Sequence, residues 1–457
     1  MARKFVLGLG LGALVGVAAL GLGEGSAQAD LSIPFVKSQL SNGMTVILHE
    51  SHAVPQVVVN INYNVGSRYE VKGRTGFAHL FEHLMFMGTK RVPTKMFDLW
   101  MEGAGGWNNA WTSNDRTDYY DVGPPSSLPL LLWMEADRLK DLGPLMTLEK
   151  LNAQREVVRN ERRQTSENTP YGKVELRLPE LMYPEGHPYH HPVIGSHQDL
   201  EAATVDDVKA FFAQNYDPGN ASIVVGGDFD PNAVKAQIER LFGGLPTRGA
   251  PKDPGAPGFS DEKTTLTSVV RETIPDDVEL EKLVIAWQSP KHLTKADAEL
   301  DLVSTALATG KASRLYKALV YEQKIAQAVE ATQDSGVLGS RFVIGVLARP
   351  GVSLDKIEAA VDKELDAIRK TPLGDDELTR AKNLVETSFV TRLESLQQRA
   401  SLLNMYQAEM KDPGWAPKDL ERYRGATKES IKDTINKVML PNARVVLRVV
   451  PKKGGAK

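Results

Sequence analysis

Hydrophobic and polar positions follow two different periods along the chain, which predicts an α+β protein with strands and helices mixed throughout. A partly alternating apolar run at residues 56–65 predicts a strand, and residues 127–140 and 148–167 have the spacing of long helices. Residues 246–262 hold four prolines and three glycines without periodicity, which is typical of a linker. Strand and helix patterns begin again beyond this linker, with long helical stretches that include residues 375–410.

The second half of the chain repeats part of the first. Residues 203–218 align without gaps on residues 426–441, and a β-rich run follows each copy. We therefore expect two homologous copies of one domain, at residues 30–245 and 263–457. The alternative is a coincidental similarity between two helix–turn–strand units.

One predicted helix, from Thr75 to Gly88, is apolar on nearly every side and should be buried. Thr75 is the expected N-cap, and Gly88 stands where the helix would end. Three polar residues interrupt the helix, namely His79, Glu82 and His83, and their spacing places them on one helical face. Because burying them without partners would cost several kcal/mol, a metal ion is the simplest partner.

The three residues form the pattern H-x-x-E-H, which inverts the H-E-x-x-H order of common zinc peptidases. Histidines at positions i and i+4 can share one zinc ion, and Glu82 beside them can hold a water molecule as general base. The corresponding positions of the second copy are Asp301, Ser304 and Thr305, so only the first copy has the pattern. Two core histidines with a surface glutamate are the alternative.

Composition narrows the classes of function. The chain has 457 residues, of which 42% are hydrophobic and 25% charged, as in ordinary globular proteins. A formal net charge of −3 gives no electrostatic reason to expect a nucleic acid as partner. The chain contains no cysteine, so a zinc site must use His, Asp or Glu, and no disulfide can form.

The start of the chain has the pattern of an export signal. A basic start precedes an apolar run at residues 5–22, and Ala27-Gln28-Ala29 matches an A-x-A cleavage site. We expect residues 1–29 to be a cleaved signal peptide, with Asp30 as the first residue of a periplasmic protein. The alternative is that the apolar run is an uncleaved membrane anchor. No later stretch of the sequence is long and apolar enough to cross a membrane.

A catalytic zinc site normally has three protein ligands, so the two histidines require a third. The helix expected after residue 148 has four glutamates, and the pattern alone does not choose among Glu149, Glu156, Glu161 and Glu167. An exposed, arginine-paired side chain on a helix face is the ordinary expectation for each of them.

Two motifs of the chain match those of a known family. One is H-x-x-E-H, and the other is V-V-x-N-E, which ends 78 positions after His83. In both motifs the chain resembles the pitrilysin family of inverted-zincin metallopeptidases. That family includes insulin-degrading enzyme and mitochondrial processing peptidase. The size of the chain points to the small-subunit branch, with the processing-peptidase beta subunit and bacterial periplasmic relatives. The resemblance implies that His79, His83 and Glu161 bind one zinc ion and that Glu82 is the general base. It also implies two homologous domains, each a mostly antiparallel sheet packed with helices, which face each other across a chamber.

The resemblance also gives a role to the glycine-rich segment that starts at Gly103. In the family, this edge strand accepts a peptide substrate by strand addition, which implies substrate contacts from Trp107, Asn108, Asn109 and Ala110. An ordinary edge strand with aromatic neighbours is the alternative.

Two departures from the family pattern bear on activity. Many relatives have a glutamate seven residues before the third ligand, where this chain has Gln154, which can hydrogen-bond but supplies no charge. Family peptidases also place an Arg and a Tyr where this chain has residues 319–328, with Gln327 or Ala328 at the tyrosine position. We therefore expect a second family subunit, in a heterodimer or a homodimer, to complete the oxyanion site.

Two other classes of function compete with a zinc endopeptidase. The first is a non-catalytic assembly or binding subunit of the same family, although such members usually lose the zinc motif. The second is a zinc carrier, which would more typically have a histidine-rich tract, whereas the nine histidines here are mostly scattered.

Overall fold

The computed structural model describes residues 31–255 and 265–452. The expected signal peptide, residues 1–29, lies outside the described residues, and so does the second part of the expected linker. The first part of that linker packs against the N-terminal half, where the Arg248 amide donates to Asp217 Oδ2 at 2.6 Å. The proposed domain bounds therefore stay a prediction. Among the described residues, no helix is long and apolar enough to cross a membrane.

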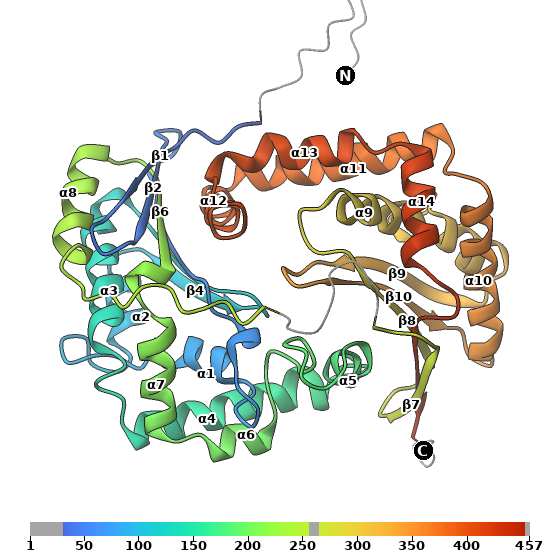
Figure 1. Cartoon of the computed structure of the whole chain (residues 1–457), viewed down its shortest axis with the longest axis horizontal. Helices are drawn as coiled ribbons and strands as arrows, with labels where there is room; N and C mark the ends of the chain where they lie inside the picture. Colours follow the sequence, from blue (N-terminus) through green and yellow to red (C-terminus); the bar gives the residue numbers. More distant parts are fainter. Residues whose placement is uncertain (1–30, 256–264, 453–457) are drawn as a thin grey trace, which may run out of the picture. The chain divides into compact units, whose positions relative to one another are not determined.

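The N-terminal half is built on a six-stranded sheet in the order β1-β2-β6-β3-β5-β4 (Figure 1). Neighbouring strands are antiparallel except for the parallel pair β2 and β6. Strand β4 lies at one edge and pairs only with β5. The strands are β1 (Val36–Gln39), β2 (Thr45–Glu50), β3 (Val57–Tyr63), β4 (Trp107–Thr112), β5 (Thr117–Gly123) and β6 (Ala221–Gly227).

The C-terminal half is built on a five-stranded sheet in the order β7-β11-β8-β10-β9. Its one parallel pair is β7 with β11, and the other pairs are antiparallel. The strands are β7 (Val270–Asp276), β8 (Lys282–Ser289), β9 (Ala326–Asp334), β10 (Ser340–Ala348) and β11 (Val445–Pro451). This sheet repeats the order of the first one without a counterpart of β1.

The internal repeat predicted from sequence is present in the structure. Helices α7 (Val205–Asn215) and α14 (Lys428–Val438) occupy equivalent positions of the two copies. Each begins at a capping box, formed by Thr204 in the first copy and Thr427 in the second. Each helix is followed by a strand that pairs in parallel with the first long strand of its own sheet. The predicted α+β fold of two homologous halves is thus confirmed.

Several predicted helices differ from the observed ones. The helix expected at residues 148–167 ends at Arg162 and continues as a π-helical turn, residues 163–167. The stretch 375–410 is two helices, because Ser395 caps a new helix by accepting a hydrogen bond from the Gln398 amide. The remaining helices are α1 (Phe77–Leu84), α2 (Met96–Gly103), α3 (Leu128–Asp141), α4 (Leu148–Arg162), α5 (Lys173–Met182), α6 (His197–Ala202), α8 (Pro231–Phe242), α9 (Lys295–Ala308), α10 (Leu354–Lys370), α11 (Asp375–Glu394), α12 (Leu396–Met410) and α13 (Ala416–Arg424).

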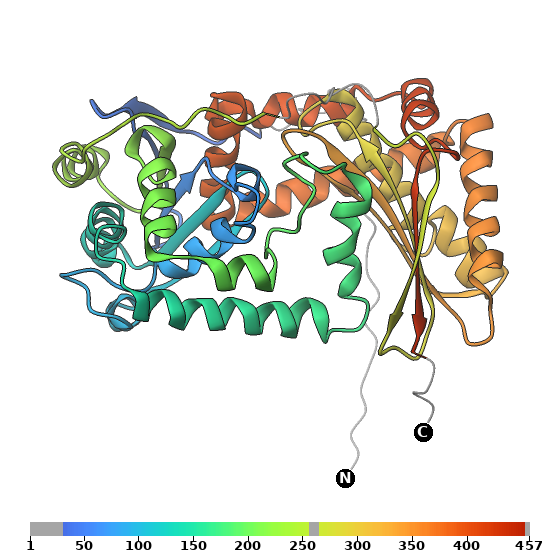
Figure 2. The same ribbon diagram turned by 60° about the horizontal axis from the view of Figure 1, so that its bottom comes forward.

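The two halves exchange helices. Helix α12 of the C-terminal half packs on β3 and β6, where the Asn404 amide donates to the Asn60 carbonyl at 2.9 Å and Ser222 donates to Asn404. In return, α5 of the N-terminal half packs on the second sheet through Val174 and Leu178 (Figure 2). Each sheet is therefore completed by a helix that the other half supplies.

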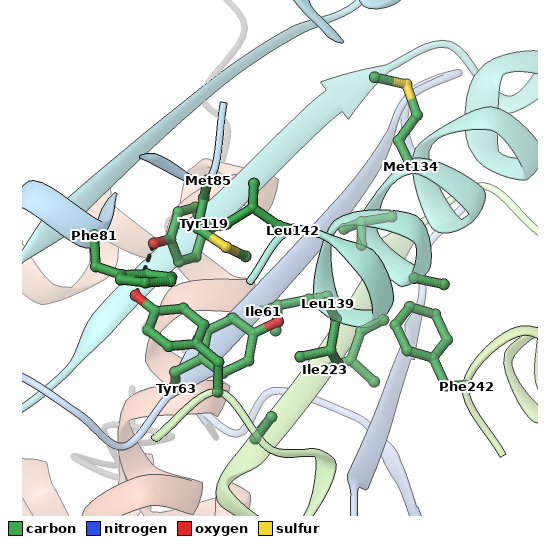
Figure 3. Close-up of a cluster of buried hydrophobic side chains, with 14 of the residues drawn as sticks. Ile61, Tyr63, Phe81, Met85, Tyr119, Met134, Leu139, Leu142, Ile223 and Phe242 are labelled. Atoms are coloured by element: carbon green, nitrogen blue, oxygen red, sulfur yellow. Dashed lines mark hydrogen bonds between the residues drawn. The ribbon is translucent and has the colours of Figure 1, made fainter. Parts of the chain in front are cut away.

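A buried cluster between the first sheet and its helices contains Tyr63, Phe81, Met85 and Tyr119 (Figure 3). Phe81 belongs to α1, so this cluster fixes the helix that carries the H-x-x-E-H motif against the sheet. Fully burying each large side chain of this kind contributes about 1.5–3 kcal/mol.

Candidate metal centre

The helix that carries the motif, α1, is shorter than predicted and begins at Phe77 rather than after Thr75. Its N-cap is Gly76, with a φ of 87° that favours glycine, and a Cβ there would lie 2.7 Å from the Ile194 carbonyl. Thr75 instead bonds through its amide and hydroxyl to Asp199. Gly88 also has a positive φ, but it lies four residues beyond the end of the helix at Leu84.

The first turn of α1 is held by a carboxyl group that sequence reasoning missed. Glu70 accepts hydrogen bonds from the amides of Gly76 and Ala78, at 2.9 and 2.7 Å. Its carboxyl group is fully buried, and this burial raises its pKa to about 8 although the amides oppose the shift. The two amides would otherwise be unpaired at the helix start, so Glu70 fixes the position of the motif helix.

The structure brings the two histidines and one of the four candidate glutamates together. His79 and His83 lie one turn apart on α1, and Glu161 reaches them from α4, which packs against α1 (Figure 1). The Nε2 atoms of His79 and His83 lie 3.6 and 3.2 Å from the two oxygens of Glu161. One ligand atom from each of the three residues lies within 4.8 Å of the others.

These residues fit a zinc ion in geometry and in charge. Tetrahedral zinc with bonds of about 2.0–2.1 Å requires ligand atoms roughly 3.3 Å apart. The two histidine–glutamate distances of 3.6 and 3.2 Å are close to that value. Burial lowers the pKa of His79 to about 4, so its imidazole is neutral and able to bind metal at neutral pH. The hydrogen bond from His83 lowers the pKa of Glu161, which is therefore a carboxylate. Two histidines and a glutamate are a known ligand set of catalytic zinc.

The fourth polar group of the centre, Glu82, lies on α1 between the two histidines. Burial raises the pKa of Glu82, although a hydrogen bond from Thr112 and the nearby His83 oppose the shift. Thr112 Oγ1 donates to Glu82 Oε2 at 2.5 Å. The carboxyl group of Glu82 is thus held beside the ligand atoms by the last residue of β4.

Comparisons with known proteins agree with this arrangement. A family model described as Insulinase (Peptidase family M16) matches residues 45–193, and one described as the Peptidase M16 inactive domain matches residues 202–385. The chain belongs to the M16 peptidase family. The resemblance to insulin-degrading and related peptidases that the sequence motifs indicated is therefore confirmed.

Relatives of this M16 chain include named zinc proteases. The zinc protease PqqE of Helicobacter pylori is 29% identical over 382 residues, which cover 80% of this chain and 82% of that protein. An uncharacterized zinc protease of Streptomyces coelicolor is 26% identical over 361 residues, 78% of this chain and 77% of that protein.

Solved structures of the same fold cover most of the chain. A protease from Helicobacter pylori has a TM-score of 0.84 and 25% identity, and covers 92% of this chain and 100% of that one. The first half of the periplasmic protease PqqL from Escherichia coli has a TM-score of 0.73 and 19% identity, and covers 92% of each chain. The second likeness shows the fold alone.

The inactive-domain match agrees with what the second half of this M16 chain contains. The residues aligned with the motif, Asp301, Ser304 and Thr305, lie on α9. Asp301 accepts a hydrogen bond from the Tyr423 hydroxyl at 2.8 Å, and burial raises its pKa to about 7. In the described residues, the cluster of His, Asp and Glu suited to a metal ion is the one formed by His79, His83 and Glu161.

Strand β4, the predicted substrate segment, is an edge strand of the first sheet. Trp107 is 49% exposed and meets Tyr120 edge-on, and Asn108 donates to Asp98 at 3.0 Å. The Ala110 amide donates to the side chain of Asn109 at 2.8 Å, which is a local partner rather than a strand partner. The edge strand that the prediction requires is therefore present in the first sheet.

The remaining predicted residues lie away from the ligand atoms. Gln154 lies two turns before Glu161 on α4, and its amide donates to the Met87 sulfur at 2.8 Å. Gln327 and Ala328 are exposed on β9, an edge strand of the second sheet. Among the described residues, no hydrogen bond or ion pair joins residues 319–328 to His79, Glu82, His83 or Glu161.

Proposed function

We propose that the chain is a zinc-dependent endopeptidase that hydrolyses peptides or unfolded polypeptides. The observation that carries this proposal is the meeting of His79, His83 and Glu161 within 4.8 Å, with Glu82 beside them. The zinc ion that these three residues would hold supplies a Lewis acid that polarises a carbonyl group and acidifies water. The names of the relatives as zinc proteases support the same chemistry.

In this proposal, the protein groups bind, orient and move protons. A peptide extends the first sheet as an added strand along β4, with the Ala110 amide exchanging its Asn109 partner for a peptide carbonyl. Glu82 removes a proton from the attacking water and delivers it to the leaving amine. Because main-chain hydrogen bonds hold the peptide, side-chain specificity is loose.

The proposal includes a partner and a compartment. A second family subunit, in a heterodimer or a homodimer, supplies the Arg and Tyr that residues 319–328 lack, and the assembled chains enclose a chamber. The chain is exported to the periplasm after removal of residues 1–29. The basic start, the apolar run at residues 5–22 and the A-x-A pattern at Ala27-Gln28-Ala29 support this compartment.

The alternative function is a non-catalytic assembly or binding subunit. The match of residues 202–385 to the inactive-domain model and the missing Arg and Tyr favour this alternative. The intact H-x-x-E-H motif and its geometry oppose it.

Cleavage of a quenched, unstructured peptide tests the proposal. The mature chain from Asp30 is assayed with zinc, alone and with a candidate family partner. We expect Glu82→Gln to lower kcat by about 10²–10⁴-fold while zinc still binds stoichiometrically. Glu156→Gln, on the exposed side of α4, is the matched control and should retain full activity.

Either result is decisive. Activity that disappears in Glu82→Gln establishes the peptidase, and dependence on the partner establishes the shared site. Stoichiometric zinc without cleavage in any mixture would contradict the peptidase and favour the assembly subunit.

A further inference from the structure

A hydrogen bond joins the proposed substrate strand to the proposed general base. Thr112 is the last residue of β4, and Glu82 is in the last turn of α1. The two residues are 30 positions apart in sequence. Their side chains meet where Thr112 Oγ1 lies 2.5 Å from Glu82 Oε2.

The direction of this hydrogen bond is fixed by its neighbours. Thr112 pairs across the sheet with Thr117, which is fully buried and donates its hydroxyl proton to the Val65 carbonyl at 2.8 Å. Thr112 Oγ1 lies 3.4 Å from Thr117 Oγ1 but 2.5 Å from Glu82 Oε2, so its proton goes to the nearer oxygen, and an ionised carboxylate can only accept. Thr112 is therefore the donor and Glu82 Oε2 the acceptor.

The arrangement distinguishes the two oxygens of Glu82. Oε2 accepts the hydrogen bond from Thr112. Oε1 makes no hydrogen bond to the residues that the structure describes. A carboxylate fixed through one oxygen presents the other in a defined direction, so the protein orients the base before any substrate arrives. Misplacement of a catalytic group by about 1 Å can lower a rate by 10²-fold, which makes such orientation consequential.

We infer that Thr112 is a positioning residue for peptide hydrolysis, which aims Glu82 Oε1 at the attacking water and couples the base to the substrate strand. This inference rests on the proposed function. In the reaction, Oε1 takes a proton from water as the new C–O bond forms, and gives that proton to the amine nitrogen as the C–N bond breaks. Thr112 keeps its own proton throughout, so its contribution is geometric.

The position of Thr112 on β4 adds a consequence for substrate choice. A peptide that extends the sheet correctly leaves the strand, and therefore Thr112 and Glu82, in place. A ligand that displaces the end of β4 moves the base as well. Coupling of this kind favours extended peptides over ligands that bind at the metal without pairing with the strand.

Two substitutions at one position test the role. Thr112→Val removes the hydroxyl and keeps the shape, and Thr112→Ser keeps the hydroxyl. With the quenched peptide, we expect Thr112→Val to lower kcat by about 10–100-fold with KM within twofold, and Thr112→Ser to remain within about threefold of wild type. Thr332→Val, an exposed threonine on the other edge strand β9, is the control.

Two readouts do not depend on activity. Zinc affinity, measured by calorimetry on the metal-free proteins, should be equal in Thr112→Val and wild type, because among the described residues the Thr112 hydroxyl bonds to Glu82 and lies near Thr117 rather than bonding to a metal-binding residue. Crystal structures of the same variants should show the Glu82 carboxylate rotated in Thr112→Val and unmoved in Thr112→Ser.

The outcomes separate this inference from the proposed function. An active wild type with an equally active Thr112→Val would overturn the positioning role alone. Equal losses in the Val and Ser variants, or a loss of zinc affinity in Thr112→Val, would show that the residue is only structural. A wild type that binds zinc but is inactive in every mixture, with and without a family partner, would overturn the proposed function, and this role with it.

Discussion

The chemistry of the candidate centre depends on a few side chains whose charge state is set by burial. His79 is kept neutral because burial disfavours its charged form, whereas the hydrogen bond from His83 keeps Glu161 ionised. A neutral imidazole beside a carboxylate is the combination that a divalent cation requires. The contribution of Glu161 is therefore mainly its charge.

Replacing that charge should weaken metal binding. Glu161→Gln keeps the shape of the side chain, and we expect it to raise the zinc dissociation constant by at least about 100-fold, measured by competition with a chelator. Zinc should raise the thermal midpoint of the wild type, because it binds only the folded state, and should raise that of the variant much less. Glu156→Gln is again the control, and equal affinities of the two variants would contradict the assignment of the third ligand.

Residues of this centre differ in how far sequence could predict them. His79, Glu82 and His83 are neighbours on one helix, so their spacing alone indicated a shared site. Glu161 lies on a different helix among other glutamates, and family resemblance was needed to select it. Glu70 contacts α1 from outside the helix, and no local pattern marks such a long-range cap.

At the scale of elements, the open edge of β4 is the feature that a peptide would use. The strand pairs on one side only, and the Ala110 amide has a side-chain partner that another strand could replace. Such an edge invites strand addition, and natural proteins usually protect it unless it has a function.

Removing the Ala110 amide should therefore weaken peptide binding. Ala110→Pro deletes the N–H group, and we expect KM for the quenched peptide to rise by at least about 10-fold, with stoichiometric zinc retained. Ala110→Ser keeps the N–H group at the same position, is the matched control and should leave KM within twofold. A KM that is unchanged in Ala110→Pro would contradict binding by strand addition.

Elements with strong periodicity were predicted well, and those whose local signals conflict were not. The repeated helices and the central strands appear where the pattern placed them. Helix α5 was missed because Pro179 lies inside it and normally marks a helix end. The helical pattern of residues 375–410 continues across the point where α11 ends and α12 begins. That boundary depends on one residue, the capping Ser395. Packing against the second sheet stabilises α5 in spite of its proline.

At the scale of the molecule, hydrogen bonds and an ion pair connect the β4–β5 turn to the C-terminal half. Asp115 accepts from the Tyr189 hydroxyl at 2.6 Å and from the Val337 amide at 3.1 Å. Arg116 pairs with Glu409 of α12 at 3.2 Å, and Glu409 also contacts His292 Nδ1 at 2.7 Å. The turn next to Thr112 is therefore held by groups from both halves.

The contact of His292 should make stability depend on pH. Burial lowers the pKa of His292, but Glu409 and the nearby charges of Asp297 and Asp419 outweigh it, so the folded-state pKa is above 6.5. A raised pKa contributes stability that is complete below about pH 6.5 and is lost as pH rises through the folded-state value. Wild type should therefore exceed His292→Asn in thermal midpoint most clearly at pH 6, and the difference should shrink toward pH 9.

A second variant makes this prediction specific. Glu409→Gln removes the charge that His292 contacts. Adding His292→Asn to the Glu409→Gln variant should therefore change the thermal midpoint by nearly the same amount at every pH. A difference between wild type and His292→Asn that stays constant from pH 6 to 9 would show that His292 does not gain a proton in the contact.

The exchange of α5 and α12 between the halves also orders events during protein synthesis. The first sheet is fully translated at Gly227, but the helix that covers β3 and β6 ends only at Met410. At usual ribosome speeds, the roughly 180 intervening residues take on the order of 10–40 s. Throughout that interval, and equally during the passage of an exported chain across a membrane, the chain exposes the sheet face that α12 later covers. Chaperone demand should therefore be concentrated on the N-terminal half, and truncated chains that end before α12 should aggregate rather than fold.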